Sequence, residues 1–261
     1  RFGHRLLRSR PYVHFFAQAS DGVRIGQWDL SPNDLKRIPV VVPPLPEQLA
    51  IVRYLDYMDR RIRRYIRAKR RLIALLNEQK QATIQRAVTR GLDPTVRLKP
   101  SGVEWLGDVP EHWEVVPLSA TAESIQTGPF GSQLHSGDYV SGGTPVVNPS
   151  HLVGGCILPD PRVTADSVTS ERLGRHRLRE GDIVMPRRGE LGRCAAVTRD
   201  QEGWLCGTGS IRVRPKASVF APDYLVQLLS SETMRYALKM YSIGTTMDNL
   251  SAGIVARLRL P

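Results

Sequence analysis

The feature that most constrains this chain is a proline-rich run followed by more than forty residues without Gly or Pro. The run is Pro43-Pro44-Leu45-Pro46-Glu47-Gln48, and the next Gly or Pro is Gly91. Proline fixes φ and lacks an N–H group, so it suits the first turn of a helix and not its interior. Glu47 adds a negative charge where the helix dipole favours one. The pattern predicts one helix within 43–92, roughly 65 Å long, that serves as a spacer.

The predicted helix carries an apolar stripe with the 3.5-residue period of a coiled coil. We call this stripe the seam; it consists of Ile51, Leu55, Met58, Ile62, Tyr65, Leu72 and Leu76. Lys69, Gln79 and Thr83 weaken it toward the C-terminal half. Such a seam needs a partner of similar length, and the sequence predicts no second helix of that kind. We therefore hypothesise that two copies pair antiparallel through this helix.

The positive charge of the chain is concentrated in its first part. Residues 1–100 hold 21 Lys and Arg and 8 Asp and Glu, whereas residues 101–261 hold 16 and 17, which together give the net charge of +12. Residues 60–71 alone carry eight cations. Such a run attracts a polyanion through counterion release. A solvated helix face and a docking surface for an acidic protein remain open as alternatives.

Composition also narrows the class of protein. No apolar stretch approaches the ~20 residues of a membrane span, so no membrane partner is expected. The widely spaced Cys156, Cys194 and Cys206 form no zinc knuckle, and we interpret them as core thiols of a reducing, cytoplasmic chain. The histidines show no metal-ligand spacing, so neither a metal nor a cofactor is expected. The first residue is Arg1, which we interpret as a sign of a fragment or a processed chain.

Residues 114–243 alternate short apolar runs with Gly, Pro and Asp, which is typical of short strands and turns. The expected strands are Val146-Val147, Ile183–Met185, Ala195–Val197 and Ile211–Arg214, and 222–240 is expected to be helical. The predicted fold class is α+β: mixed short strands and helices, with mostly non-local sheet pairing, attached to one long coiled-coil-type spacer helix.

One internal repeat occurs at an offset of about 220 residues. Gly22 followed by 29–38 and Pro43 is echoed by Gly244 followed by 249–258 and Pro261. Asp-Leu-Ser in the first copy corresponds to Asn-Leu-Ser in the second, and a helical stretch precedes each. If the echo is real, the chain covers one full period of a duplicated protein.

Several motifs together resemble a known family. They are the run 43–48, the helix end Ala87-Val88-Thr89-Arg90-Gly91-Leu92, and the stretch from Ser101 to Trp113 with its two Trp residues. In this combination they resemble the specificity subunit of type I restriction–modification systems. Gly128-Pro129-Phe130-Gly131-Ser132 and the stretch 181–192 are similar to the target-recognition domains of that family.

The resemblance implies a division of the chain. Residues 1–42 would be the C-terminal end of a first target-recognition domain and 43–92 the central spacer helix. Residues 93–113 would be a connecting strap, 114–243 the second target-recognition domain, and 244–261 the lead into a distal helix that is absent here. The partners implied are double-stranded DNA, methylation subunits and a restriction subunit. The chain itself would be non-catalytic and would direct adenine methylation and cleavage by those partners.

The candidate DNA-binding residues lie in loops of the second recognition domain: Gly128, Phe130, Gly131, Ser132, Arg187, Arg188 and Arg193. Glycines let the backbone approach a phosphate, and arginine is the usual bidentate partner of guanine. Gln133 and Asn148 are weaker candidates for reading adenine. Arg212 and Arg214 are also weaker, because alternate residues of a strand often face solvent.

Two other classes of function stay open at this point. Cys206-Gly207-Thr208-Gly209-Ser210 and Asn148-Pro149-Ser150-His151 resemble methyltransferase motifs, but the first precedes a strand-like pattern and the second lacks the aromatic residue that stacks on a flipped base. The alternatives are thus a DNA adenine methyltransferase fragment and a coiled-coil adaptor without a DNA role.

Overall fold

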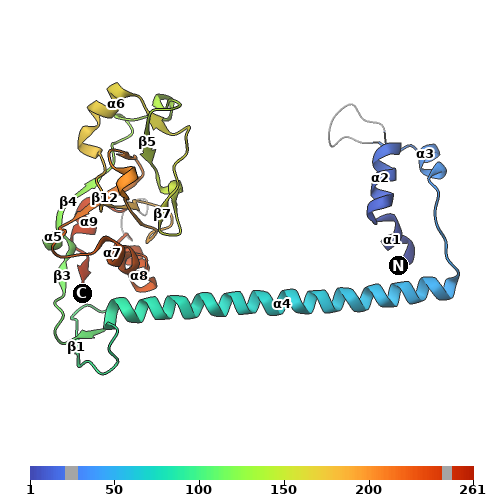
Figure 1. Cartoon of the computed structure of the whole chain (residues 1–261), viewed down its shortest axis with the longest axis horizontal. Helices are drawn as coiled ribbons and strands as arrows, with labels where there is room; N and C mark the ends of the chain where they lie inside the picture. Colours follow the sequence, from blue (N-terminus) through green and yellow to red (C-terminus); the bar gives the residue numbers. More distant parts are fainter. Residues whose placement is uncertain (21–28, 243–248) are drawn as a thin grey trace. The chain divides into compact units, whose positions relative to one another are not determined.

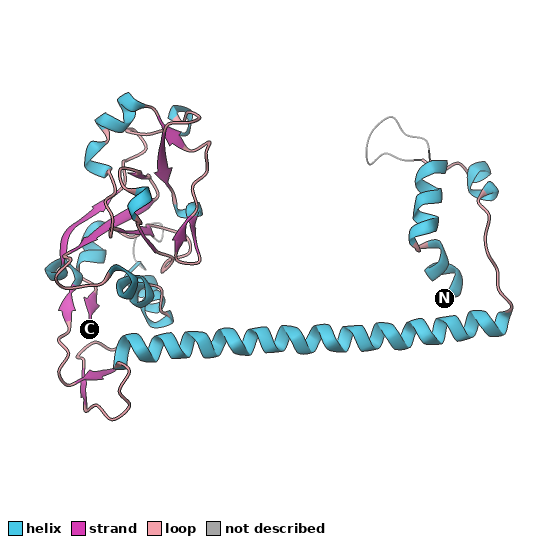
Figure 2. Cartoon of the chain, viewed as in Figure 1, coloured by secondary structure: helices cyan, strands magenta, loops and turns pink. Residues whose placement is uncertain are grey.

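The computed structural model describes residues 1–20, 29–242 and 249–261. It divides into two compact units, Arg1–Leu76 and Asn77–Pro261. The boundary falls inside helix α4, the long helix of Figures 1 and 2. The helices and strands of both units bear out the predicted α+β class with one long helix.

The first unit contains the short helices α1 (Phe2–Leu7), α2 (Arg10–Ala19) and α3 (Pro32–Arg37), and the N-terminal part of α4. Tyr12 of α2 is buried, and its hydroxyl donates to the carbonyl of Pro39 at 3.1 Å and accepts from the amide of Val41 at 3.0 Å. The guanidinium of Arg5 pairs with Asp56 of α4. These contacts tie the N-terminal helices to the start of the long helix.

Helix α4 runs from Leu45 to Arg90 over 46 residues, an axial length of about 69 Å. It begins within the proline-rich run, where the side chain of Gln48 donates to the carbonyl of Pro43 at 2.8 Å. It ends where Gly91 adopts φ 74° and its amide donates to the carbonyl of Ala87 at 3.1 Å. The left-handed conformation at this C-terminal position is the reason for a glycine. In the described part of the chain no helix is long and apolar enough to cross a membrane.

The second unit combines short strands and helices around several small sheets. Its strands are β1 (Leu98–Pro100), β2 (Asp108–Pro110), β3 (Val116–Pro117), β4 (Ala122–Thr127), β5 (Thr144–Val147), β6 (Leu152–Val153), β7 (Cys156–Ile157), β8 (Thr164–Ala165), β9 (Ile183–Pro186), β10 (Ala195–Ala196), β11 (Leu205–Cys206), β12 (Ser210–Pro215) and β13 (Arg259–Leu260). Its α-helices after α4 are α5 (Leu118–Thr121), α6 (Ser167–Arg172), α7 (Pro222–Leu229), α8 (Glu232–Ser242) and α9 (Ala252–Ala256). Short 3₁₀ turns lie at Ser136–Asp138, Pro149–His151, Gly174–His176 and Arg199–Gln201.

The central sheet has the strand order β10-β9-β12-β4, with antiparallel neighbours throughout. A second sheet has the order β11-β5-β8, in which β11 and β5 are parallel. Two-stranded pairs join β1 to β2, β3 to β13 and β6 to β7. The pairings of β4 with β12 and of β3 with β13 connect distant parts of the chain, as the non-local prediction requires.

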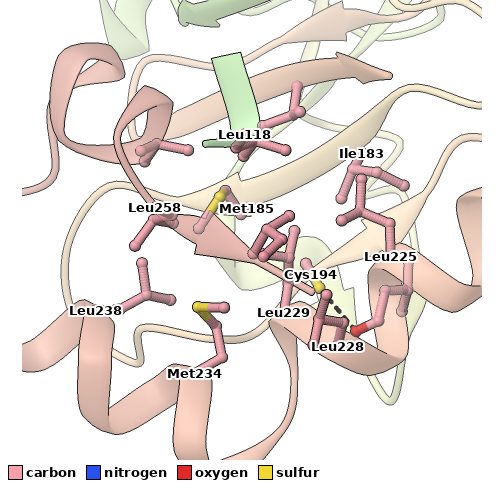
Figure 3. Packing of buried hydrophobic residues seen from close by; sticks show 14 of the residues in the cluster. Leu118, Ile183, Met185, Cys194, Leu225, Leu228, Leu229, Met234, Leu238 and Leu258 are labelled. Carbon is pink, nitrogen blue, oxygen red and sulfur yellow. Dashed lines mark hydrogen bonds between the residues drawn. The ribbon is translucent and has the colours of Figure 1, made fainter. Parts of the chain in front are cut away.

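Alternation along the central strands creates two different faces. Ile183 and Met185 of β9, with Ile211 and Val213 of β12, join the main core against helices α7, α8 and α9. Figure 3 shows how Met185 packs among leucines of this cluster. Val184 points to the opposite face and joins a second core that includes residues of β5, β10 and β11. The last turns of α4 belong to the main core through Val88, whose carbonyl accepts from the hydroxyl of Tyr224 at 3.1 Å.

Two details of the sequence-based prediction are wrong. The helix expected over 222–240 is two helices, α7 and α8, because the chain breaks at Ser230 and Ser231. The side chain of Ser231 donates to the carbonyl of Leu228 and accepts from the amide of Met234, which ends one helix and begins the next. Of the expected core thiols, Cys194 and Cys206 are buried, but Cys156 is exposed.

The internal repeat has a structural counterpart. Ser31 caps α3 by accepting from the amide of Asp34 at 3.1 Å, and Ser251 caps α9 by accepting from the amide of Ile254 at 3.2 Å. Each capped helix follows a longer one, α2 in the first copy and α8 in the second. The copies differ in burial: Leu35 is 50% exposed, whereas Val255 is fully buried. Gly22 and Gly244 of the predicted echo lie outside the described residues.

Candidate nucleic-acid interface

Two predicted loops leave the central sheet at the same end. Strands β4 and β9 both run antiparallel to β12, so their C-terminal ends flank its start. The amide of Gly128, just after β4, donates to the carbonyl of Ser210 at 2.9 Å. The amide of Arg187, just after β9, donates to the carbonyl of Gly209 at 2.9 Å. The sheet register therefore brings together residues that are about sixty positions apart in the sequence.

Phe130 and Arg187 meet where these loops emerge. The guanidinium carbon of Arg187 lies 5.9 Å from the centroid of the Phe130 ring, a cation–π arrangement. The Phe130 side chain is 59% exposed, so the ring presents a free apolar surface. The backbone of Arg187 is fixed by the amide of Leu250, which donates to its carbonyl at 2.7 Å. An exposed ring beside a cation on a fixed backbone suits contact with a nucleotide.

The other predicted residues occupy different parts of these loops. Gly128 is buried, whereas Gly131, Ser132 and Arg188 are exposed. A Cβ atom at Gly128 would lie 1.8 Å from the carbonyl oxygen of Gly207, so only glycine allows this approach of two backbones.

Arg193 serves the structure of its own loop. Its Nε donates to the carbonyl of Leu152 at 3.0 Å, and its Nη1 pairs with the carboxylate of Glu190 at 2.9 Å. These contacts hold the guanidinium against the protein, and the role of Arg193 in DNA binding stays a prediction.

The glycine loop at 206–210 connects strand β11 to strand β12. A cofactor-binding glycine loop opens a helix, whose N-terminus holds the phosphate or carboxylate. Here the glycines instead allow two segments of the chain to pass close to each other. A Cβ at Gly207 would lie 2.1 Å from Oδ1 of Asn148. The Asn148 side chain also donates to the hydroxyl of Tyr139 at 3.2 Å. Both methyltransferase-like motifs thus belong to one packing arrangement.

The arginines of β12 do not face solvent in the way that alternation suggested. Arg212 is only 5% exposed, and its guanidinium donates to the side chains of Ser124 and Gln126 at 3.3 and 2.8 Å. Arg214 pairs with the buried Asp182, with Nε and Nη2 each 2.7 Å from a carboxylate oxygen. The segment Arg-x-Arg-x-Arg at 175–179 lies next to Arg212. The sequence-based prediction did not name it as a candidate, although arginines at every other position are typical of an exposed charged edge.

Protonation in this region is set by burial. The pKa of His176 is lowered to about 4, first by burial and then by the charges of Arg175 and Arg212. Its Nε2 accepts from the Nε of Arg175 at 3.0 Å, as a neutral imidazole does.

Burial raises the pKa of the Cys194 thiol to about 11 and that of Cys206 to about 12. Neither thiol has the low pKa of a nucleophile. No group of three or more metal-ligating side chains occurs among the residues that the structure describes.

The seam of α4 is largely uncovered. Ile62 is 50% exposed, and Tyr65, Leu72 and Leu76 are exposed to a similar degree. Ile51, Leu55 and Met58 are partly buried. Residues 60–71, with their eight cations, are exposed throughout. The middle of the helix therefore presents an apolar stripe and a dense positive charge without cover from the described part of the chain.

Comparisons with known proteins agree with the resemblance in the motifs. No family model matches the chain. It is 23% identical over 233 residues to the type I restriction enzyme MjaVIII specificity subunit of Methanocaldococcus jannaschii, covering 87% of this chain and 52% of that protein. The crystal structure of the HsdS subunit from Thermoanaerobacter tengcongensis aligns over the whole chain and 57% of its own, with 20% identity and a TM-score of 0.54.

A second solved structure, which concerns complex assembly and conformational transition of the type I restriction–modification system, aligns with a TM-score of 0.64. It is 19% identical and covers all of this chain and 58% of that one. The chain has the fold of a type I specificity subunit. The predicted resemblance to type I specificity subunits is confirmed, and the chain spans about half the length of these relatives.

Proposed function

We propose that this specificity-subunit chain recognises a DNA sequence for a type I restriction–modification complex. The observation that carries the proposal is the pairing of exposed Phe130 with Arg187 at one end of a rigid sheet, in a chain with this fold. In this proposal the chain is non-catalytic. Its loops read base edges, while methylation and restriction subunits methylate adenine and cleave DNA. Binding and positioning are the whole of its contribution.

The proposed division of the chain into domains follows the internal repeat. Residues 1–42 would form the end of a first recognition domain, because α2 and α3 repeat the order and the serine cap of α8 and α9. Residues 43–92 would be the spacer helix, 93–113 the strap and 114–243 the second recognition domain. Residues 244–261 would lead into a distal helix. The exposed apolar residues of α2 and α3 are consistent with this scheme, since α8 and α9 bury apolar residues in the main core.

The test of recognition is retention on duplex DNA at moderate salt. The wild-type chain should prefer one sequence over competitor DNA. The double variant Arg187→Ala/Arg188→Ala should lose about 1–3 kcal/mol for each base contact that it removes. A matched control is Arg257→Ala with Arg162→Ala, which removes the same charge from exposed positions elsewhere in the second unit. Equal preference in wild type and the Arg187/Arg188 variant would count against the proposal.

The exposed seam supports a second part of the proposal, the antiparallel association of two copies. Burying the apolar side chains of a long seam is the main stabilisation of a coiled coil. We expect a dimeric mass at tens of micromolar for the wild type and a monomeric mass for Ile62→Asp/Leu72→Asp. A wild-type chain that stays monomeric at that concentration would refute self-association and leave the seam to a helix of another chain.

The methyltransferase alternative is tested separately. Its cofactor loop would have to be 206–210, which instead joins two strands and packs against Asn148. Isothermal titration of the isolated chain with S-adenosylmethionine should give no binding signal, and micromolar affinity would sink the non-catalytic proposal. A coiled-coil adaptor without a DNA role is excluded if specific duplex retention is observed and depends on Arg187 and Arg188.

A further inference from the structure

An edge of the second unit presents arginines on every other residue. Arg175, Arg177 and Arg179 are exposed, whereas His176 and Leu178 between them are buried. Arg175 lies in the 3₁₀ turn Gly174–His176, and the chain is extended from Arg177 onward, so the side chains of Arg177 and Arg179 share one side. All three arginines line one pocket. The amide of Leu178 donates to the carbonyl of Trp204 at 2.8 Å, and Arg177 forms an isolated antiparallel β-bridge with Leu205. The row of arginines is therefore held on a fixed backbone.

Two further arginines, Arg212 and Arg214, line the same pocket from strand β12. The Nη1 of Arg212 donates to the carbonyls of Arg175 and Arg177, each at 3.0 Å. The Nη2 of Arg214 lies 3.4 Å from the carbonyl of Arg177. With Arg179 and Glu202, these residues line a pocket of about 320 Å³.

The charge of this pocket is unbalanced. Its lining includes five arginines and one carboxylate, Glu202, and the buried Asp182 next to it forms its ion pair with Arg214. Among the described residues no ion pair neutralises the remaining arginines. This concentration is notable because residues 101–261 as a whole hold 16 cations and 17 anions.

Arg212 gives an independent sign that an anion belongs here. It is 95% buried, since only 5% of it is exposed, and its Nε has no hydrogen-bond partner in the described part of the chain. A buried cation without a counter-ion is costly, and an anion in the adjoining pocket offsets that cost. Burial, and next the charge of Arg214, lower the pKa of Arg212, which reflects the same excess of positive charge.

The neighbouring pocket shows where an anion would not bind. It has a volume of about 300 Å³ and shares Arg179 and Arg214 with the first. However, Glu123, Glu180 and Asp182 also line it. The two arginines are therefore offset by carboxylates on that side, and the arginine-rich pocket is the one that selects an anion.

A hydrogen-bond bridge joins this pocket to the candidate recognition loop. The Oε1 of Gln133 accepts from the Nη2 of Arg175 and from the amide of Phe130, each at 3.3 Å. Phe130 in turn contacts Arg187. A chain of contacts thus connects the exposed ring and the loop arginine with Arg175 of the pocket.

We propose that the pocket formed by Arg175, Arg177, Arg179, Arg212 and Arg214 binds a backbone phosphate of the DNA whose bases face Phe130 and Arg187. This inference rests on the proposed DNA-recognition function. The exposed guanidinium groups form an open row, which suits a phosphodiester chain passing over it. Phosphate contacts fix the register of the protein on the duplex and carry no sequence information, so the pocket positions the loops that read bases.

The experiment is a fluorescence-anisotropy titration of the full chain with a labelled short duplex of mixed sequence at several salt concentrations. The test variant is Arg177→Gln/Arg179→Gln, because both side chains are exposed. Arg175 and Arg212 are left intact because they hold neighbouring segments together. The control is Arg162→Gln/Arg257→Gln, with the same change of charge, and circular dichroism verifies that both fold. A parallel arm measures the thermal stabilisation of each chain by millimolar inorganic phosphate.

The test variant should bind about tenfold more weakly near 0.1 M salt, and the slope of log K against log salt should fall by about 1 for each lost phosphate contact. The control should stay within about twofold of wild type. Equal affinity and slope in the test variant would overturn the phosphate site. A third outcome is that inorganic phosphate stabilises the wild type but not the variant, while both bind DNA equally. That outcome would show a site for free anions and would also overturn the DNA phosphate site.

Failure of this inference is distinguishable from failure of the proposed function. If binding depends on Arg187 and Arg188 but not on Arg177 and Arg179, the function stands and the phosphate site is wrong. If the wild type binds no DNA at all, both are wrong.

Discussion

The backbone segments at Gly128 and Gly207 cross in close contact next to the candidate recognition loop. Substitutions of two glycines, Gly128 and Gly131, test this crossing. At Gly128 an added Cβ would lie 1.8 Å from the carbonyl oxygen of Gly207, and an ordinary contact begins at 3.4 Å. The two segments would have to separate by about 1.6 Å. Both are fixed, since Gly128 donates to Ser210 and Gly207 donates to Val147, each at 2.9 Å. At Gly131, in contrast, nothing lies within 4 Å of an added Cβ.

The structure therefore predicts opposite effects for the same substitution. Gly128→Ala overpacks the crossing, at about 1–3 kcal/mol, and weakens a hydrogen bond worth about 1 kcal/mol. We expect a loss of about 3 kcal/mol in the free energy of unfolding, or roughly 6–12 °C in Tm for a unit of this size. Gly131→Ala should be neutral or stabilising by about 0.4–1 kcal/mol, because it reduces the entropy of the unfolded chain.

The assay is urea denaturation of the full chain, followed by tryptophan fluorescence, with calorimetry to locate the transition of the second unit. Stabilities of the two variants that agree within about 0.5 kcal/mol would refute the crossing. That result would also reopen the loop at 206–210 as a ligand site, because space would then exist beside Gly207.

Three further predictions concern buried groups of the second unit. Asp182→Asn should lose about 3 kcal/mol of stability, because it leaves a largely buried guanidinium without its counter-ion, as measured by urea denaturation. The pKa of His176 is about 4 in the folded chain and 6.5 in the free side chain. The stability that goes with the neutral imidazole is therefore fully present above pH 6.5 and is lost as the pH falls toward 4. The loss amounts to about 3 kcal/mol, measurable as a fall in Tm with pH that is smaller in His176→Gln. A thiol reagent should modify Cys156 in the native chain but Cys194 and Cys206 only after unfolding.

Each of these predictions has a control or a contradicting outcome. Asp160→Asn removes an exposed pair with Arg162 and should cost less than about 1 kcal/mol, so an equal loss in both aspartate variants would deny the importance of burial. An identical pH profile in His176→Gln and wild type would show that the imidazole does not couple to folding. Rapid modification of all three thiols in the native chain would contradict the two buried positions.

The parts of the fold that depend on neighbouring residues were predictable from the sequence. The long helix follows from the proline-rich start, the absence of Gly and Pro, and the stop at Gly91. A short apolar run identified β9 as a strand, and the alternation of apolar residues and arginines identified β12. The break at Ser230 and Ser231 was missed because serine is tolerated inside a helix, and only its hydrogen bonds to Leu228 and Met234 show that it ends one there.

The composition of the site was only partly predictable. Loops rich in Gly and Arg could be identified, but the meeting of Phe130 with Arg187 depends on the register of β4 and β9 against β12. Burial of Arg212 was not foreseeable, because it requires that the segment carrying Arg175 and Arg177 crosses over the sheet and accepts its hydrogen bonds. Such contacts join parts of the chain that are far apart in sequence, and no local pattern encodes them.

The most direct test of the central claim is selection of duplexes from a pool with a randomised core, with sequencing of the bound fraction. The account predicts that the wild-type chain enriches a defined short sequence and that Arg187→Ala/Arg188→Ala does not. A bound pool with the same sequence distribution as the input would contradict DNA recognition by this chain.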